Sequence, residues 1–192
     1  VDRRQRQMCI RDSHKTTGVS KNRIIGMGGA LDSARFKYRL AEALNAPISD
    51  VDGMVIGGHS DKGMVPLISK ATRNSIKVTN FLSDERLNQV REDTKVGGAT
   101  LTKLLGTSAW YAPGAAVSSL VHSIACDHNK VFPCSALLEG EYGLSDLCIG
   151  VPVVLGKNGI EEIIELDLNP EDLAHLSESA DGVKKTNSLL SL

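Results

Sequence analysis

The sequence lacks three features that would each point to a broad class of protein. No run of apolar residues approaches the roughly 18–20 that a membrane-spanning helix needs. Its 22 lysines and arginines nearly balance its 23 aspartates and glutamates, which argues against a strongly basic nucleic-acid-binding protein. The four cysteines form no CxxC pair; they are Cys9, Cys126, Cys134 and Cys148. We therefore expect neither disulfides nor a zinc cluster, no membrane or nucleic-acid partner, and a reducing, cytoplasmic compartment.

The composition that is present is typical of a globular protein. Hydrophobic residues make up 41% of the chain and charged residues 23%. A length of 192 residues suits one domain with a substantial core. The first residues carry no apolar stretch of the kind that follows the start of a secretory signal.

The N-terminal segment differs in charge from the rest of the chain. Residues 1–23 hold seven basic and two acidic residues, a balance of +5, and leave −6 for the remainder. One interpretation is a basic arm that binds phosphates. We favour another, because residues 3–13 (RRQRQMCIRDS) resemble a translated sequencing adaptor. We therefore expect residues 1–13 to be a non-native, adaptor-derived segment and residues 14–192 to form the domain.

Hydrophobic spacing predicts four helices. Residues 31–44 have apolar positions at helical intervals, and Asn45 and Pro47 follow as stop signals. Ser83 precedes two acidic residues and so predicts the start of a long helix that ends at Leu105. Within that helix, Gly97-Gly98 indicates close packing or a kink. Small apolar residues at 115–128 predict a well-buried helix, and a last helix begins at Glu171.

Short apolar runs bounded by turn residues predict the strands, at residues 54–56, 65–68, 75–78, 131–138, 147–155 and 160–166. The pair Asn158-Gly159 is typical of a hairpin turn. Because the last three strands are joined by short connections, we expect an antiparallel sheet. The order of elements therefore predicts an α+β fold rather than a doubly wound α/β domain.

Two glycine-rich segments look at first like phosphate-binding loops. Residues 26–31 begin like GxGxxG, but the third glycine is replaced by Leu31. Residues 150–157 resemble a Walker loop with one residue too many, and Asn158 stands where a magnesium-binding Ser or Thr is needed. Neither segment predicts a nucleotide-phosphate site.

Three residues carry the best candidate chemistry. Asp32 and Arg35 are three positions apart and so share one helix face; the plainer interpretation is an acid near the helix N-terminus that pairs with an arginine. His59 follows Gly57-Gly58 at a strand end, which suits a catalytic histidine better than a helical position does. The plainer interpretation of His59 is a surface turn.

Metal binding is the competing interpretation for the histidines. His59 with Asp61 could begin a metal site, but no other ligand-rich cluster accompanies them. His122 and Cys126 are four apart on a predicted helix, and we interpret them as half-buried packing residues. We therefore expect no metal.

Together, a carboxylate, a histidine and an arginine suit one kind of reaction. The carboxylate orients the imidazole and favours its protonated form, and the planar guanidinium matches a substrate carboxylate. This combination favours proton exchange at a hydroxyl or carbonyl beside a carboxylate. It does not favour acyl transfer, because no motif pairs a serine or cysteine nucleophile with the histidine.

Four segments together resemble the lactate/malate dehydrogenase family: residues 26–36 (GMGGALDSARF), 57–67 (GGHSDKGMVPL), 107–114 (TSAWYAPG) and 138–156 (LEGEYGLSDLCIGVPVVLG). The similarity runs from about residue 14 to the end and is to the C-terminal, substrate-binding half. It implies an α+β fold with a twisted antiparallel sheet and packed helices.

The resemblance also implies a role for each residue of the site. His59 would donate and accept the proton, Asp32 would hold and polarise it, and Arg35 would bind the carboxylate next to the reacting carbon. Ala109 would line the substrate pocket, and Pro113 would lie near the nicotinamide. The loop that begins at His59 is one residue longer than the commoner family form, with Ser60 in place of a glycine.

The resemblance implies NAD as the cofactor, bound mainly by an N-terminal domain. This sequence contains no counterpart of that domain's glycine-rich loop, so we expect the chain alone to be inactive. Residues 108–113 resemble the malate form, which implies that malate and oxaloacetate, small dicarboxylic acids, are the substrates. Two alternatives stay open: a lactate or other 2-hydroxy acid dehydrogenase, and a non-catalytic oligomerisation module. The family also implies a homo-oligomer, a dimer or tetramer.

Overall fold

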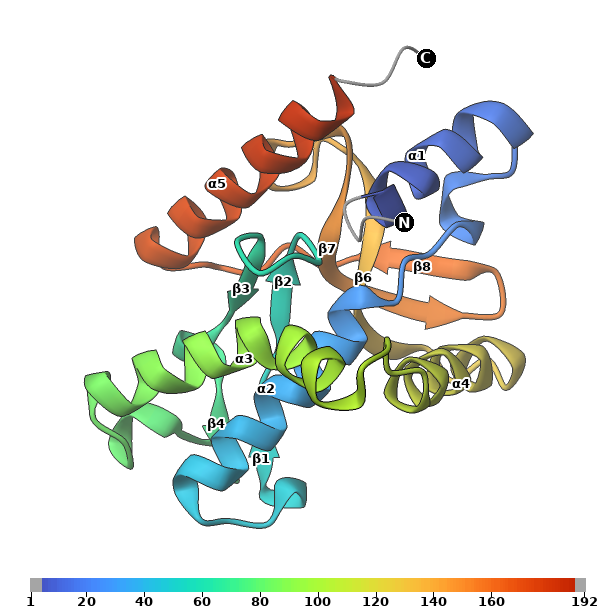
Figure 1. The fold of residues 1–192 in the computed structure, drawn as a ribbon. Coiled ribbons are helices and arrows are strands. Elements are labelled where there is room, and N and C mark those ends of the chain that lie inside the picture. Colours follow the sequence, from blue (N-terminus) through green and yellow to red (C-terminus); the bar gives the residue numbers. More distant parts are fainter. Residues whose placement is uncertain (1–4, 189–192) are drawn as a thin grey trace.

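The computed structural model describes the backbone of residues 5–188 and the side chains of residues 10–188 (Figure 1). The α+β prediction is confirmed, because every strand pairing is antiparallel and helices pack around the sheets. Residues 1–4 and 189–192, at the outer ends of the two predicted segments, lie outside the described residues, as does the side chain of Cys9.

The larger sheet has the strand order β3-β2-β7-β6, and β8 also pairs with β7. Its strands are β2 (Val55–Gly57), β3 (Met64–Pro66), β6 (Lys130–Glu139), β7 (Ser145–Gly156) and β8 (Gly159–Ile163). Seven successive residues of β7, from Leu147 to Val153, are buried. Because neighbouring side chains of a strand point to opposite faces, β7 is covered on both faces, and its continuous apolar pattern follows from this.

A smaller sheet of three short strands, in the order β1-β4-β5, lies beside the lower end of helix α2 (Figure 1). Its strands are β1 (Val51–Asp52), β4 (Thr72–Arg73) and β5 (Ile76–Lys77). The predicted strand at 75–78 is therefore shorter than expected, since its last residue, Val78, begins a short 3-10 helix. The predicted strand at 65–68 likewise ends at Pro66, and Ile68 belongs to another 3-10 turn.

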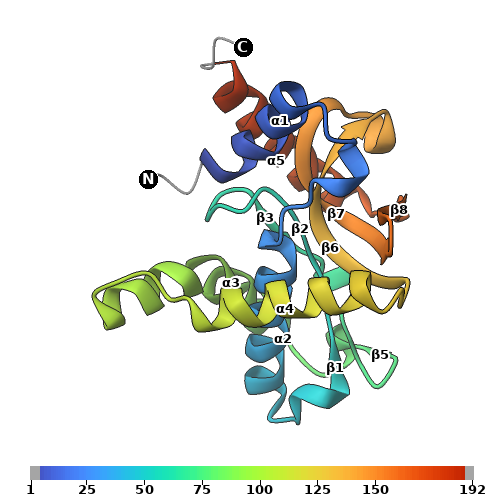
Figure 2. The same ribbon diagram turned by 90° about the vertical axis from the view of Figure 1, so that its right-hand side faces the viewer.

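The helices are α1 (Gln5–Thr17), α2 (Gly28–Leu44), α3 (Asp84–Leu105), α4 (Tyr111–Ala125) and α5 (Pro170–Asn187). Helix α2 crosses the middle of the molecule between α3 and the large sheet, and α5 packs against β2, β3 and β7 (Figures 1 and 2). None of the helices within residues 5–188 is long and apolar enough to cross a membrane.

The helix boundaries show which local signals the sequence contains. Helix α2 begins at Gly28, three residues before the predicted start. It ends at Leu44, and the C-cap residue Asn45 closes the last turn with a left-handed backbone (φ 46°). The Ser83 hydroxyl accepts a hydrogen bond from the Arg86 backbone N–H, as expected of a cap. In α5, Asn169 caps the Asp172 backbone N–H with Pro170 as the first helical residue. The pair Asn158-Gly159 lies at the predicted hairpin, between β7 and β8.

One prediction about burial is wrong. Residues 115–128 were expected to form a well-buried helix, but α4 runs from Tyr111 to Ala125 and only Leu120 and Ser123 in it are buried. It packs against β7 and α2 on one side and leaves Tyr111, Val117 and Val121 exposed. Apolar composition alone therefore does not show which side chains of a helix are buried.

The expected boundary between residues 13 and 14 falls inside α1. In this helix the Arg11 guanidinium binds the Asp146 carboxylate through two nitrogens, at 2.8 and 3.2 Å. The hydrogen bond from Arg11 lowers the pKa of Asp146, and the same bond raises the pKa of Arg11. The origin of residues 1–13 stays a prediction, since a segment of any origin can form a helix.

Candidate active site

The three predicted residues meet where the N-terminal part of α2 faces the loop that follows β2. Asp32 is buried, with 2% of its surface exposed. Its Oδ2 lies 2.6 Å from Nδ1 of His59, and its Oδ1 accepts a hydrogen bond of 2.9 Å from Nη1 of Arg35. An ionised carboxylate can only accept hydrogen bonds, so Nδ1 of His59 donates and Nε2 is the nitrogen left for proton exchange.

Asp32 and Arg35 were predicted to share a helix face, and they do. The plainer interpretation, an acid near the helix N-terminus that pairs with an arginine, is correct about the ion pair but incomplete, because the same carboxylate also binds His59. Arg35 keeps 20% of its side-chain surface exposed and His59 keeps 17%. A guanidinium has five N–H donors, so one bond to Asp32 leaves capacity to bind a carboxylate from solvent.

The first turn of α2 allows His59 to approach closely because it starts with glycine. A Cβ atom placed on Gly28 would lie 2.7 Å from Cγ of His59, and one on Gly29 would lie 2.7 Å from the carbonyl oxygen of Pro133. Both distances are too short for real side chains. The glycine-rich segment that resembled a phosphate loop therefore packs the start of α2 against β6 and the histidine ring.

The loop that carries His59 has a constrained backbone. Gly57 ends β2 in a left-handed conformation (φ 86°), and a Cβ there would lie 2.3 Å from the Gly63 carbonyl oxygen. Ser60, which replaces the family glycine, accepts hydrogen bonds from the backbone N–H of Gly63 at its own carbonyl (2.9 Å) and at its hydroxyl (3.1 Å). The longer loop is thus closed by its own hydrogen bonds.

Sequence reasoning missed Ser179, which fixes the His59 loop from the far end of the chain. This buried α5 residue accepts a hydrogen bond from the Gly58 backbone N–H and donates one to the Gly63 carbonyl, both 2.8 Å long. Its signal in the sequence is a hydroxyl on the buried side of α5, next to Leu176, Ala180 and Val183. A polar residue on such a face has to find a buried partner.

Ala109 and Pro113 take no part in the hydrogen bonds that join Asp32, Arg35 and His59. Ala109 is half-buried in the connection between α3 and α4, and Pro113 is half-buried in the first turn of α4. Proline is tolerated there because the first N–H groups of a helix have no partner within it. Their roles beside substrate and nicotinamide stay predictions.

The interpretation of His122 and Cys126 as half-buried packing is wrong. Both are exposed, and they stand with exposed His128 in a group whose ligand atoms all lie within 4.8 Å of one another. His59 and Asp61 belong to no such group among the residues whose side chains are described.

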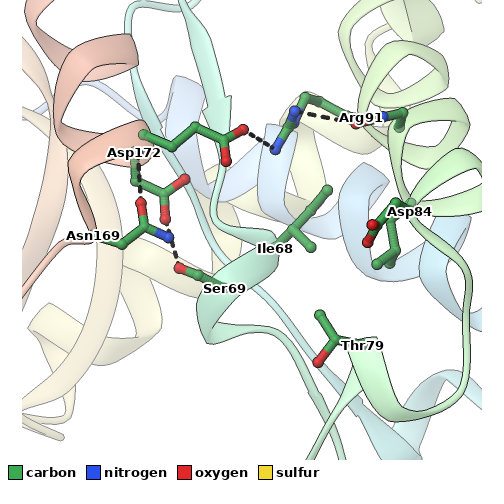
Figure 3. Close-up of a pocket in the computed structure, with 10 residues that line it drawn as sticks. Ile68, Ser69, Thr79, Asp84, Arg91, Asn169 and Asp172 are labelled. Atoms are coloured by element: carbon green, nitrogen blue, oxygen red, sulfur yellow. Dashed lines mark hydrogen bonds and ion pairs between the residues drawn. The ribbon is translucent and has the colours of Figure 1, made fainter.

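A polar pocket of about 400 Å³ lies between α3, α5 and the 3-10 turns before α3 (Figure 3). Three of its four charged side chains have partners: Arg91 binds Glu171, and Asp172 accepts a hydrogen bond of 2.5 Å from the Ser69 hydroxyl. These contacts tie α5 to the rest of the fold. The pocket therefore has a structural explanation, and it does not include the three candidate catalytic residues.

Burial raises the pKa of two cysteine thiols in the larger sheet. Cys134 on β6 and Cys148 on β7 are buried, and their removal from water raises the pKa of each thiol to about 12. Neither is a candidate nucleophile, because the reactive form of a cysteine is the thiolate.

Comparison with known proteins places this geometry in a family. The family model for the lactate/malate dehydrogenase, alpha/beta C-terminal domain, matches residues 29–189. The chain therefore belongs to the lactate/malate dehydrogenase family, in agreement with the resemblance of its motifs.

The relatives show what share of a family member's length this chain spans. A malate dehydrogenase of Bacteroides thetaiotaomicron is 62% identical over 178 residues, which are 93% of this chain and 57% of that protein. The structure of Salinibacter ruber malate dehydrogenase matches with a TM-score of 0.90 and 42% identity, covering 95% of this chain and 59% of that one. An Eimeria maxima lactate dehydrogenase with NADH and oxamate matches with a TM-score of 0.91, 36% identity and coverages of 95% and 57%. The chain thus spans somewhat more than half the length of such proteins.

Proposed function

We propose that this chain is the substrate-binding and catalytic part of an NAD-dependent malate dehydrogenase, an oxidoreductase that interconverts malate and oxaloacetate. The observation that carries the proposal is the buried Asp32 carboxylate, which binds both His59 (2.6 Å) and Arg35 (2.9 Å). A histidine oriented by a carboxylate, beside an arginine whose side chain is partly exposed, suits proton exchange next to a substrate carboxylate.

In the proposed reaction, Arg35 binds the carboxylate beside the reacting carbon and so fixes the position of the substrate hydroxyl. His59 accepts the hydroxyl proton at Nε2 when malate is oxidised and returns it to the carbonyl oxygen when oxaloacetate is reduced. Asp32 holds the ring by Nδ1 and compensates the positive charge that the ring gains. When bound, NAD supplies the acceptor for the hydride that leaves the substrate carbon.

The residues of this chain do not by themselves form a dinucleotide site of the glycine-rich type. The glycines at 28 and 29 contact His59 and the β6 backbone, which leaves them no room to approach a pyrophosphate. We therefore propose that NAD is bound mainly by a separate N-terminal domain. Pro113 contributes at the nicotinamide side and Ala109 at the substrate side of the shared site.

The choice of malate rests on the relatives and on the segment at 108–113. The Bacteroides and Salinibacter proteins are malate dehydrogenases, whereas the Eimeria protein is a lactate dehydrogenase with the same fold. The higher identities belong to the first two, so they support malate. We accordingly propose small dicarboxylic acids as the substrates. The proposed compartment is the cytoplasm, and the proposal includes no membrane or nucleic-acid partner.

A second candidate function, an oligomerisation module, is favoured by one observation. Apolar side chains at the end of α3 and along α4 are exposed, among them Leu104, Trp110, Tyr111 and Val121. Monomeric proteins rarely leave so many large apolar groups together in water. We propose that an NAD-binding domain and a second copy of the chain cover this surface in a dimer or tetramer.

The function is tested by restoring an NAD-binding half. The N-terminal half of the Bacteroides thetaiotaomicron relative, fused ahead of residue 14, should give a chimera that forms NADH from malate and NAD. The variant His59→Asn should reduce the rate by about 100-fold or more, the contribution typical of a general acid–base group. The variant His175→Asn, on α5, serves as the matched control and should keep the rate. A folded chimera that binds NAD but forms no NADH would contradict the proposal and favour the oligomerisation module.

A further inference from the structure

Three side chains at the C-terminal end of α4 gather into a cluster that the proposed reaction does not use. His122 lies in the last turn of the helix, Cys126 is the C-cap residue, and His128 follows two residues later. The Cys126 sulfur is 3.7 Å from Nδ1 of His122, and the His122 and His128 ring centroids are 4.8 Å apart at 82°. The candidate ligand atoms of all three lie within 4.8 Å of one another.

The backbone brings these residues together without involving their side chains. His122 and Cys126 are four residues apart and so share a helix face. After Cys126 the chain turns through Asp127, which has a left-handed backbone (φ 51°), and the His128 N–H binds the Ser123 carbonyl at 2.9 Å. That turn folds His128 back over the last helical turn. The buried Ser123 hydroxyl donates to the Leu155 carbonyl, which anchors this end of α4 to β7.

The chemistry of the three groups fits one class of ligand. Imidazole nitrogen and thiolate sulfur are the ligands that Zn²⁺ prefers, with bonds of about 2.0–2.3 Å. In a tetrahedral site such bonds place the ligand atoms about 3.3–3.8 Å apart. The Cys126–His122 distance of 3.7 Å already has this value. The remaining ligand atoms lie within 4.8 Å of one another, and all three side chains are exposed.

The surroundings also favour a cation at this position. The last carbonyl groups of a helix carry partial negative charge, and the cluster stands at that end of α4. Asp127, between the ligands in sequence, points elsewhere: its Oδ1 accepts a hydrogen bond from the Lys157 backbone N–H, and its Oδ2 lies 3.6 Å from Nζ of Lys157.

We propose that His122, Cys126 and His128 bind one Zn²⁺ ion, with a fourth position occupied by water. Binding forms one Zn–S and two Zn–N bonds, and the Cys126 thiol releases its proton to solvent, so no electrons are transferred. The ion would link the end of α4 to the turn that precedes β6. The site is separate from Asp32, Arg35 and His59.

The test is calorimetric titration of the full chain with Zn²⁺ alone. We expect one ion per chain at micromolar or tighter affinity. The variants His122→Asn, Cys126→Ser and His128→Asn should each weaken binding by at least tenfold. The matched control His175→Asn should bind as the unaltered chain does. Circular dichroism of each variant verifies that the fold is intact.

A second measurement needs no variant. Zn²⁺ should slow the alkylation of Cys126 by iodoacetamide, located by peptide mass mapping, because a metal-bound sulfur is less available to the reagent. Buried Cys134 and Cys148 should stay unlabelled with or without the metal. The proposal is overturned if the chain binds no Zn²⁺, if the three variants bind as well as the unaltered chain, or if labelling of Cys126 does not change.

Discussion

At the scale of single residues, the site depends on one buried carboxylate with two partners. Asp32 and Arg35 could be assigned to the same helix face from their spacing alone, because an α-helix fixes which side chains are neighbours. That His59 joins them was implied by family motifs and not by spacing, since its contact with Asp32 spans 27 residues. In the sequence, Gly28 belongs to a segment that fails as a phosphate motif and resembles the family, and neither observation assigns it a packing role. Its true constraint, the ring of His59, is visible only once the chain has folded.

The buried thiols predict how stability depends on pH. Burial raises the pKa of Cys134 and of Cys148 to about 12, from an ordinary value of 9.0. Well below pH 9 both thiols are neutral in the folded and unfolded states, so their contribution is constant. Between pH 9 and 12 only the unfolded chain ionises there, and the free energy of unfolding should fall by about 1.4 kcal/mol per pH unit for each thiol.

Urea unfolding at pH 8, 9 and 10 measures this fall in stability, and the double variant Cys134→Ala, Cys148→Ala is the comparison. The variant should be less stable at pH 8, because it leaves cavities, yet should lose less stability than the unaltered chain as the pH rises. Equal slopes for the two chains would show that the thiols do not cause the alkaline loss.

At the scale of elements, local sequence signals predicted where helices begin and end more accurately than they predicted which residues are buried. Ser83 and Asn45 set the boundaries of α3 and α2 as their capping preferences require. The strands β6 and β7 also lie within two residues of their predicted ends. The burial of α4 could not be predicted in this way, because it depends on which surface faces the helix. The contact of α5 with the His59 loop is equally non-local.

The stability that the contact between α5 and the His59 loop contributes can be measured by substituting Ser179. The variant Ser179→Ala removes one hydroxyl and leaves two buried backbone groups, the Gly58 N–H and the Gly63 carbonyl, without that partner. We expect the free energy of unfolding to fall by about 2 kcal/mol. In the chimera, kcat should fall as well, because the loop that holds His59 loses its anchor to α5.

The matched control is Ser177→Ala, an exposed serine two positions earlier on the same helix. Its stability and kcat should stay close to those of the unaltered chain. If Ser179→Ala lowered stability but left kcat and its pH profile unchanged, Ser179 would be a packing residue and not a positioning one.

At the scale of the whole molecule, the chain corresponds to part of the length of its relatives. It spans 57% of its Bacteroides relative, and several of its exposed apolar side chains lie on α4 and the end of α3. Composition and periodicity predicted the α+β fold but not this exposed surface, because the spacing of apolar residues along a helix does not show which of them a neighbouring element covers. The wrong prediction that α4 is well buried has this cause.

The most direct measurement of the central claim is the turnover of the chimera with Asp32→Asn. Asparagine keeps the size of Asp32 but not its charge, so it can neither hold His59 in the same way nor compensate the proton that His59 accepts. We predict that kcat for malate oxidation falls by about 100-fold or more while the melting temperature changes little. A variant that folds and keeps the turnover of the unaltered chimera would contradict the assignment of His59 as the proton-transferring residue that Asp32 holds.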